Sequence, residues 1–167
     1  MLALLGASLL AGCSPTFDWR EVHIASTGLR AMLPCKPDKG SREMPMAGRQ
    51  VALQVLGCDT GGATFAVLFA NLGDATRSAE VLAQWNQATL ANLRSPAGAS
   101  QPFLPSGAIA LPSSAQVLAT GQRADGSAVQ SRAAYFARGA WVFQAVVFAG
   151  QLQPQFTDPF FAGLRFE

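Results

Sequence analysis

The sequence predicts an α+β fold: an antiparallel sheet of about six to eight strands with one long helix and a short C-terminal helix packed on it. Apolar residues make up 50% of the 167 residues, which is enough for one domain with a substantial core. Short segments that alternate between apolar and polar residues are separated by Gly-containing turns, as in antiparallel hairpins. One longer segment, residues 74–93, carries apolar residues at helical spacing.

The strand predictions rest on this alternation. Residues 49–57 alternate strictly, which indicates a half-buried strand, whereas residues 63–70 are apolar on both faces, which favours a central place in the sheet. Pro45 cannot donate a ladder hydrogen bond, so the segment around it is expected at a sheet edge. Trp19 is expected to anchor in the core, with an exposed binding aromatic as the alternative. The expected strands are residues 21–25, 29–33, 41–46, 49–57, 63–70, 108–111, 116–123, 128–137, 141–149 and 164–166.

Two helices are expected. Asp74 is the predicted N-cap of the long helix, which ends near Leu93. The residues predicted to face the sheet are Val81, Leu82, Trp85, Ala88, Thr89 and Leu93. The short helix has either Asp158 as its N-cap, with Pro159 at the first helical position, or a start near Pro154.

The first twelve residues resemble a secretion signal. The uncharged run MLALLGASLLAG is too short to span a membrane and fits the hydrophobic region of a signal peptide. It ends in Leu10-Ala11-Gly12-Cys13, which resembles the lipobox of bacterial lipoprotein precursors. The resemblance implies that Cys13 carries a diacylglyceryl thioether and becomes the first residue of the mature chain. Because signal peptides usually open with Lys or Arg, Met1 is expected to lie inside a longer signal. The alternative is a soluble chain that contains this Cys by chance.

The lipobox divides the chain into a signal segment (residues 1–12), a lipidated tether (13–18) and one domain (19–167). Ser14 is not the Asp that usually retains lipoproteins in the inner membrane of enteric bacteria. The expected location is therefore the cell envelope, at the outer membrane facing the periplasm, with the membrane contacted through the lipid on Cys13.

The other two cysteines are expected to form a disulfide. With Cys13 lipidated, Cys35 and Cys58 remain as a pair in an oxidising compartment. Each follows an apolar run at a strand end, so the two ends are expected to be neighbours. Two buried free thiols are the alternative. A metal site is not expected, because the chain has no CxxC motif and His23 is its only histidine.

The order of the expected elements resembles the Mog1/PsbP-like sandwich, an antiparallel sheet flanked by helices. The segments that carry the likeness are residues 28–34 (GLRAMLP) and 160–166 (FFAGLRF). The segments PCKP at 34–37 and GCD at 57–59 are similar to those of uncharacterised proteobacterial lipoproteins. Members of this fold class bind quite different partners, so the resemblance implies a fold and transfers no functional residue.

The sequence contains no motif for catalysis or a cofactor. GxSxG, SxxK, P-loop and GxGxxG patterns are missing, and His23 is expected on the exposed face of a strand. A net charge of +2 without a basic stripe argues against nucleic-acid binding. The charged residues Lys36, Asp38, Lys39 and Arg42 are expected to be solvated, with contact to an anionic partner as the alternative.

The expected function is therefore a non-catalytic lipoprotein that binds a protein or another envelope component. The best candidate for a partner surface is the stretch of residues 94–114, where Phe103 and Leu104 stand among Pro, Gly and Ser. The alternative is that these two side chains pin the stretch onto the core. Two other functions stay open: an envelope enzyme with an unrecognised site, and a binder of an apolar small molecule between the helix and the sheet.

Overall fold

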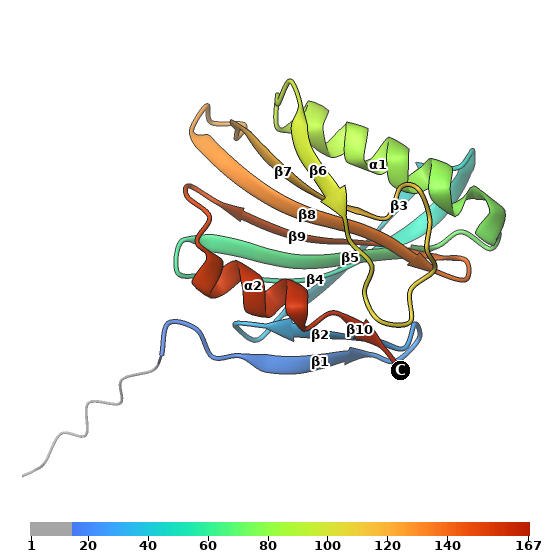
Figure 1. The fold of residues 1–167 in the computed structure, drawn as a ribbon, viewed down its shortest axis with the longest axis horizontal. Coiled ribbons are helices and arrows are strands. Elements are labelled where there is room, and N and C mark those ends of the chain that lie inside the picture. Colours follow the sequence, from blue (N-terminus) through green and yellow to red (C-terminus); the bar gives the residue numbers. More distant parts are fainter. Residues whose placement is uncertain (1–14) are drawn as a thin grey trace, which may run out of the picture.

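A computed structural model describes residues 15–167, a range that contains ten strands and two α-helices (Figure 1). The predicted lipidation site, Cys13, lies outside the described residues. The strands are β1 (Arg20–Ile24), β2 (Leu29–Leu33), β3 (Asp38–Met46), β4 (Arg49–Thr60), β5 (Ala63–Asn71), β6 (Gly98–Pro102), β7 (Ala115–Gln122), β8 (Ala128–Arg138), β9 (Trp141–Ala149) and β10 (Arg165–Phe166). The helices are α1 (Ser78–Asn92) and α2 (Pro154–Ala162). Neither helix is long and apolar enough to cross a membrane.

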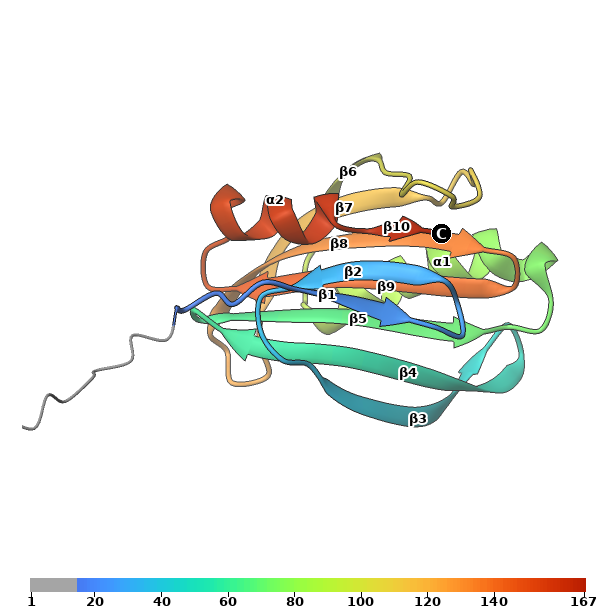
Figure 2. The ribbon, with the colours of Figure 1, turned by 90° about the horizontal axis from the view of Figure 1, so that it is seen from below.

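The strands form two antiparallel sheets. The large sheet has the order β3-β4-β5-β9-β8-β7-β6, and the small sheet has the order β1-β2-β10. Helix α2 and the small sheet cover one face of the large sheet, and α1 lies on the other (Figures 1 and 2). The predicted α+β class with an antiparallel sheet, a long helix and a short C-terminal helix is confirmed. The strands are divided between two sheets, because the first hairpin pairs with the C-terminal strand instead of with the long strands.

Strand β5 separates two hydrophobic cores. Its residues Phe65, Val67 and Phe69 face the small sheet and α2, while Ala66 and Ala70 face α1. In the large sheet β5 lies between β4 and β9. The central position predicted from its two apolar faces is confirmed, and the small residues on the α1 side leave more room there.

The N-terminal segment is packed onto the first core. The Phe17 ring stacks on Phe156, with ring centroids 5.7 Å apart, and meets Phe65 edge to face. Trp19 also meets Phe65 edge to face, which confirms its predicted anchoring. The Thr60 hydroxyl donates to the carbonyl of Thr16. Residues 16–18, assigned to the tether from the sequence, are therefore part of the packed structure.

The stretch of residues 94–114 differs from its prediction. The expected strand at residues 108–111 is wrong: in that segment Ile109 makes only an isolated bridge to Ala137. The strand of this stretch is β6, which runs along the edge of the sheet and pairs with β7. Its sequence GASQP has no apolar alternation, and the strand is held by backbone pairing, which a side-chain pattern does not reveal.

Two helix starts also differ in detail. Asp74 accepts a hydrogen bond of 2.9 Å from the Thr76 N–H and caps a 3₁₀ turn (Ala75–Arg77) that leads into α1, so the predicted cap is confirmed one turn earlier than the α-helix. Helix α2 begins at Pro154, so the alternative with Asp158 as N-cap is wrong. The Asp158 carboxylate instead pairs with Arg132 at 2.6 Å.

Candidate functional site

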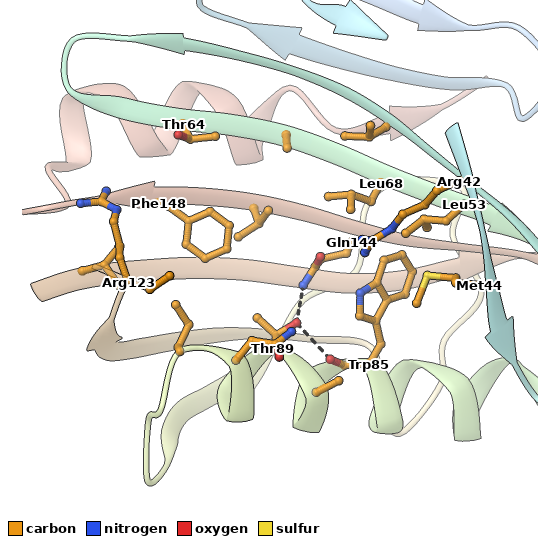
Figure 3. A pocket seen from close by; sticks show the side chains of 18 of the residues that line it. Arg42, Met44, Leu53, Thr64, Leu68, Trp85, Thr89, Arg123, Gln144 and Phe148 are labelled. Atoms are coloured by element: carbon orange, nitrogen blue, oxygen red, sulfur yellow. Dashed lines mark hydrogen bonds between the residues drawn. The ribbon is translucent and has the colours of Figure 1, made fainter. Parts of the chain in front are cut away.

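A pocket of about 540 Å³ lies between helix α1 and the large sheet (Figure 3). Strands β3, β4, β5 and β9 form its floor, α1 forms its roof, and the β7–β8 hairpin borders one end. The main lining residues are Arg42, Met44, Leu53, Val55, Thr64, Ala66, Leu68, Trp85, Ala88, Thr89, Arg123, Gln144, Val146 and Phe148.

The pocket exists because α1 is packed tightly only at its two ends. Val81 and Leu82 are buried near the start of the helix, and Leu93 is buried just after its end. Between these points the helix presents Trp85, which is half-buried, and the exposed Ala88. The methyl group of Ala88 is too small to reach the sheet, so the middle of the interface stays open.

The walls of the pocket are mainly apolar. Val55, Leu68, Trp85 and Phe148 line it and are each left half-buried by the protein itself. A ligand that covered these side chains would remove apolar surface from water, at about 25 cal/mol per Å². The pocket is therefore suited to an apolar or amphiphilic molecule.

One polar group sits in the floor. Gln144, which is 4% exposed, donates from Nε2 to the Thr89 hydroxyl at 2.8 Å and to the Tyr135 hydroxyl at 3.0 Å. Thr89 in turn donates to the Trp85 carbonyl at 3.0 Å. Burial raises the pKa of the Tyr135 phenol above its ordinary value. This chain of hydrogen bonds ties α1 to the sheet across the pocket.

Charge is concentrated at the two ends of the pocket. Arg42 on β3 and Arg123 after β7 lie at opposite ends in Figure 3. The residues that line the pocket include no Asp, Glu, His or Cys. The pocket thus combines apolar walls with cationic ends.

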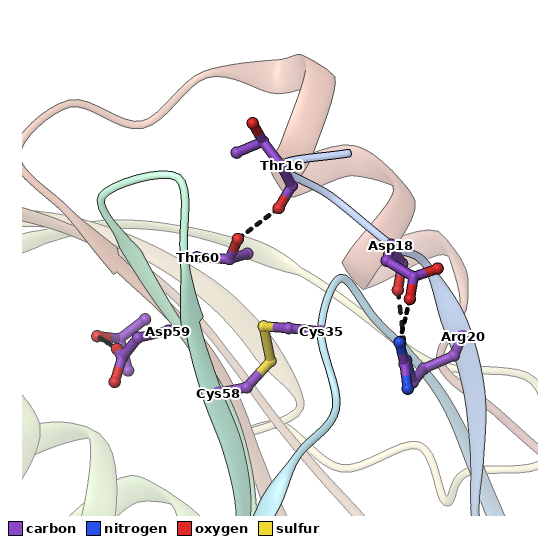
Figure 4. Close-up of a disulfide and its surroundings, with 8 residues drawn as sticks. Thr16, Asp18, Arg20, Cys35, Cys58, Asp59 and Thr60 are labelled. Carbon is purple, nitrogen blue, oxygen red and sulfur yellow. Dashed lines mark hydrogen bonds and ion pairs between the residues drawn. A yellow bond between two sulfur atoms is a disulfide. The ribbon is translucent and has the colours of Figure 1, made fainter. Parts of the chain in front are cut away.

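The predicted disulfide is confirmed. Cys35 and Cys58 are bonded, with their Cα atoms 6.0 Å apart (Figure 4). The bond joins the connection after β2 to the end of β4, on the side of β4 that faces the first core. The disulfide does not line the pocket, because the pocket lies against the opposite side of β4, where Val55 contributes to its lining.

The two residues predicted as a partner surface differ from each other. Phe103 is half-buried, with its ring 6.4 Å from that of Phe136 and 6.1 Å from that of Phe161, measured between centroids. Leu104 is 52% exposed, and Ile109 in the same loop is 40% exposed. Phe103 therefore pins the loop to the core, as the alternative interpretation held, while Leu104 is available at the surface.

His23 and the charged cluster are exposed, as the sequence predicts, although β3 begins at Asp38, three residues before the expected start of that strand. His23 is exposed on β1, and Lys36, Asp38 and Lys39 are exposed as well. Arg42, from the same cluster, is exposed at one end of the pocket. Within residues 15–167 the structure contains no group of three or more His, Cys, Asp or Glu side chains that could hold a metal ion.

Sequence reasoning did not locate the pocket, although it left open a ligand between helix and sheet. The available signal was in the apolar stripe of α1, whose middle positions are held by Ala88 and Thr89 instead of by large apolar residues. A stripe with small and polar residues at its centre indicates incomplete packing there.

Comparison with models of known protein families gave no match, and neither did a search of curated proteins. The function is therefore argued from the geometry of the pocket and from the lipobox.

Proposed function

We propose that this protein is a lipid-anchored, non-catalytic envelope protein that binds an apolar small molecule of the envelope in the pocket between α1 and the large sheet. The observation that carries the proposal is the pocket itself. Its volume of about 540 Å³ falls within the range of roughly 300–1,000 Å³ typical of small-molecule sites. Its half-buried walls give such a ligand apolar contacts that the protein does not use for itself.

The anchoring part of the proposal rests on Leu10-Ala11-Gly12-Cys13. Two or more acyl chains hold a protein stably at a membrane, whereas one chain does so only marginally. The mature protein is expected to begin at Cys13, to carry lipid and to reside at the outer membrane. Intact-mass analysis of the membrane fraction tests this. A soluble protein with an unmodified Met1 would contradict it.

Binding is favoured over catalysis by the chemistry of the pocket. A hydrolytic or acid–base mechanism needs a nucleophile or a pair of titratable groups at the site. The lining has arginines, amides and two threonines, but no carboxylate, imidazole or thiol that could activate a hydroxyl. An envelope enzyme remains an alternative only with a site elsewhere, and a turnover screen of the purified protein with envelope esters and glycans would reveal it.

Ligand binding is tested by filling the pocket from the helix. Ala88 and Ala91 are both exposed alanines of α1, but only Ala88 lines the pocket. Ala88→Phe is expected to occupy the pocket and to weaken binding of the apolar fluorophore N-phenylnaphthylamine by about tenfold or more, which is 1.4 kcal/mol. Ala91→Phe is the matched control and is expected to bind as the unaltered protein does. Equal affinities for the two variants would contradict the proposal.

A second candidate function, a protein partner, is favoured by one observation. Leu104 and Ile109 are large apolar side chains exposed in a single loop stiffened by Pro105. Exposed apolar residues on an ordered loop are common at protein interfaces. In-cell crosslinking followed by mass spectrometry, comparing the unaltered protein with Leu104→Ser, tests this candidate.

A further inference from the structure

We propose that the ligand of the pocket is an anionic membrane lipid, which places one acyl chain along the apolar walls and its acidic headgroup at Arg123. The inference rests on the proposed function and adds the ligand class and its direction of entry. Three observations carry it: where the N-terminal segment meets the domain, where the pocket opens, and where its positive charge lies.

The N-terminal segment is fixed to one end of the large sheet. The Thr60 hydroxyl holds the Thr16 carbonyl beside the β4–β5 turn (Figure 4). The ring of Phe17 lies so close to Gly61, in the same turn, that a side chain there would overlap it. Cys13 precedes Thr16 by three residues, which span at most about 11 Å. With lipid on Cys13, the β4–β5 turn must lie next to the bilayer.

The pocket reaches the same end of the sheet. Thr64 follows the β4–β5 turn and stands opposite Phe148 in the pairing of β5 with β9, and both residues line the pocket. The β7–β8 hairpin, with Arg123 at its start, turns at this end as well (Figure 1). Arg123 is exposed and Thr64 and Phe148 are half-buried, so solvent reaches the pocket at this membrane-proximal end, which we take as its mouth.

The charge at this mouth selects an anion. Arg123 is exposed and lines the pocket, whose other lining residues include no carboxylate. The carboxylate of Asp125, in the same hairpin, accepts hydrogen bonds from the hydroxyl and N–H of Ser127, at 2.6 and 2.9 Å, which lower its pKa. The charge of Arg123 is near enough to help lower this pKa, but the two side chains form no ion pair in the described residues, so the donors of Arg123 are not paired with Asp125. An Arg guanidinium pairs well with a phosphate, because its donors match two phosphate oxygens at once.

The apolar walls extend inward from the mouth. In Figure 3 Phe148 lies near the Arg123 end, and Leu68 and Trp85 lie toward the far end. An acyl chain that enters beside Phe148 keeps its headgroup at Arg123 and at the level of the bilayer surface. Arg42 lies at the opposite end, out of reach of a headgroup that stays at the mouth.

The experiment uses the lipidated full-length mature protein in phosphatidylcholine vesicles that contain phosphatidylglycerol with a photoreactive acyl chain. After illumination, crosslinked peptides are identified by mass spectrometry. We expect crosslinks to Phe148 and Leu68, and a yield at least about fivefold lower for Arg123→Gln. Arg94→Gln is the matched control. Arg94 is exposed just after the C-terminal end of α1, near the β7–β8 hairpin, but it does not line the pocket. Both variants remove one positive charge, so general attraction to the membrane changes equally.

Two further arms distinguish the outcomes. If photoreactive phosphatidylcholine labels the pocket as strongly as phosphatidylglycerol, and Arg123→Gln has no effect, the inference is overturned. The proposed function still stands in that case if Ala88→Phe, which fills the pocket, abolishes labelling. Stronger dependence on Arg42→Gln than on Arg123→Gln overturns the assigned direction. Photoreactive palmitate that labels the pocket better from solution than the lipid does from the bilayer overturns the membrane source. If no probe labels the pocket and the apolar fluorophore binds Ala88→Phe normally, the proposed function fails as well.

Discussion

Gly121 allows strand β7 to pass directly beside the end of α1. The N–H of the next residue, Gln122, donates to the Leu93 carbonyl at 2.8 Å. A Cβ at position 121 would overlap that same carbonyl oxygen. This close approach fixes the C-terminal end of α1 over the mouth of the pocket, so the shape of the site depends on a residue that has no side chain.

Gly121→Ala is therefore expected to destabilise the domain by about 1–3 kcal/mol, because strand and helix must move apart. The measurement is urea denaturation followed by tryptophan fluorescence. Gly150→Ala is the control, since a Cβ there meets no atom within 4 Å and its φ is not positive. Its effect should stay within about 0.5 kcal/mol. Equal unfolding midpoints for the two variants would show that the close approach is not rigid.

Asp74 makes the stability of the turn before α1 depend on pH. The Thr76 hydroxyl and then the Thr76 N–H donate to the Asp74 carboxylate and lower its pKa below the ordinary value. Because the pKa is lower in the folded state, the contribution to stability is present above the ordinary pKa and is lost as pH falls through the folded one. Asn also accepts capping hydrogen bonds, but it carries no charge and does not titrate.

The unaltered protein is accordingly expected to lose more stability than Asp74→Asn between about pH 5 and pH 2. The measurement is the urea midpoint of each protein across this range. At pH 5 and above, the charged cap should give the unaltered protein the higher midpoint. A difference between the two proteins that stays constant down to pH 2 would contradict this assignment.

At the scale of elements, the loop from Phe103 to Ser114 combines a pinned end with an exposed one. Phe103→Ala is expected to cost about 1–3 kcal/mol, less than a fully buried Phe, because the side chain is half-buried. Leu104→Ser should change stability by less than about 0.5 kcal/mol, because its side chain is exposed. Thermal unfolding of the two single variants measures this. Similar losses in both would mean that Leu104 also packs, which would remove it as a clean probe of a protein partner.

The disulfide connects the regions of β2 and β4, two strands that belong to different sheets and share no backbone ladder. It joins the connection after β2 in the small sheet to the end of β4 in the large one, across a sequence separation of 23. The double variant Cys35→Ala, Cys58→Ala is expected to lower the free energy of unfolding by about 3 kcal/mol, mainly because the unfolded chain gains conformational entropy without the cross-link. Urea denaturation measures the loss. The unaltered protein after reduction should match the double variant, and a reduced protein as stable as the oxidised one would contradict the estimate.

The elements that the sequence predicted correctly are those whose side chains carry the pattern. The β1–β2 hairpin alternates in burial along Leu29–Leu33, and β5 is apolar on both faces and central. By contrast, β6 is mostly exposed and is defined by its pairing with β7. The start of α2 was ambiguous because Pro154 and Pro159 both suit a first helical turn. Burial of Phe156 and Thr157 favours the earlier start.

The pocket could not be derived from the sequence for a different reason. Arg42, Thr64 and Phe148 lie on separate strands, which the sheet order β3-β4-β5-β9 brings side by side. Trp85 is supplied by α1 and Arg123 by the β7–β8 hairpin. Alternation shows which residues share a face of one strand. It does not show whether a helix packs closely on that face or leaves a space above it. The disulfide could be predicted because, once Cys13 is assigned to lipidation, the remaining two of the three cysteines allow a single pairing.

At the scale of the whole molecule, the two faces of the large sheet are built differently. One face is closed by α2, the small sheet and a cluster of phenylalanines around Phe65 and Phe143. The other face carries α1 alone, and the pocket lies beneath it. The first face therefore carries the larger buried core, whereas the core on the second face leaves space beneath α1 for a ligand.

Under the proposed anchoring through Cys13, the distance between this second face and the membrane is set by the few residues between Cys13 and Thr16. A Gly/Ser insertion of about 20 residues after Ser14 would let the domain move roughly 25 Å from the bilayer. Because the insertion precedes Thr16, the packing of Phe17 and the melting temperature should not change. Photolabelling by phosphatidylglycerol in the anchoring bilayer is expected to fall several-fold, since the mouth no longer rests at the surface. Binding of N-phenylnaphthylamine from solution should stay as it was and serves as the control. Undiminished labelling would mean that the short connection does not hold the mouth at the bilayer.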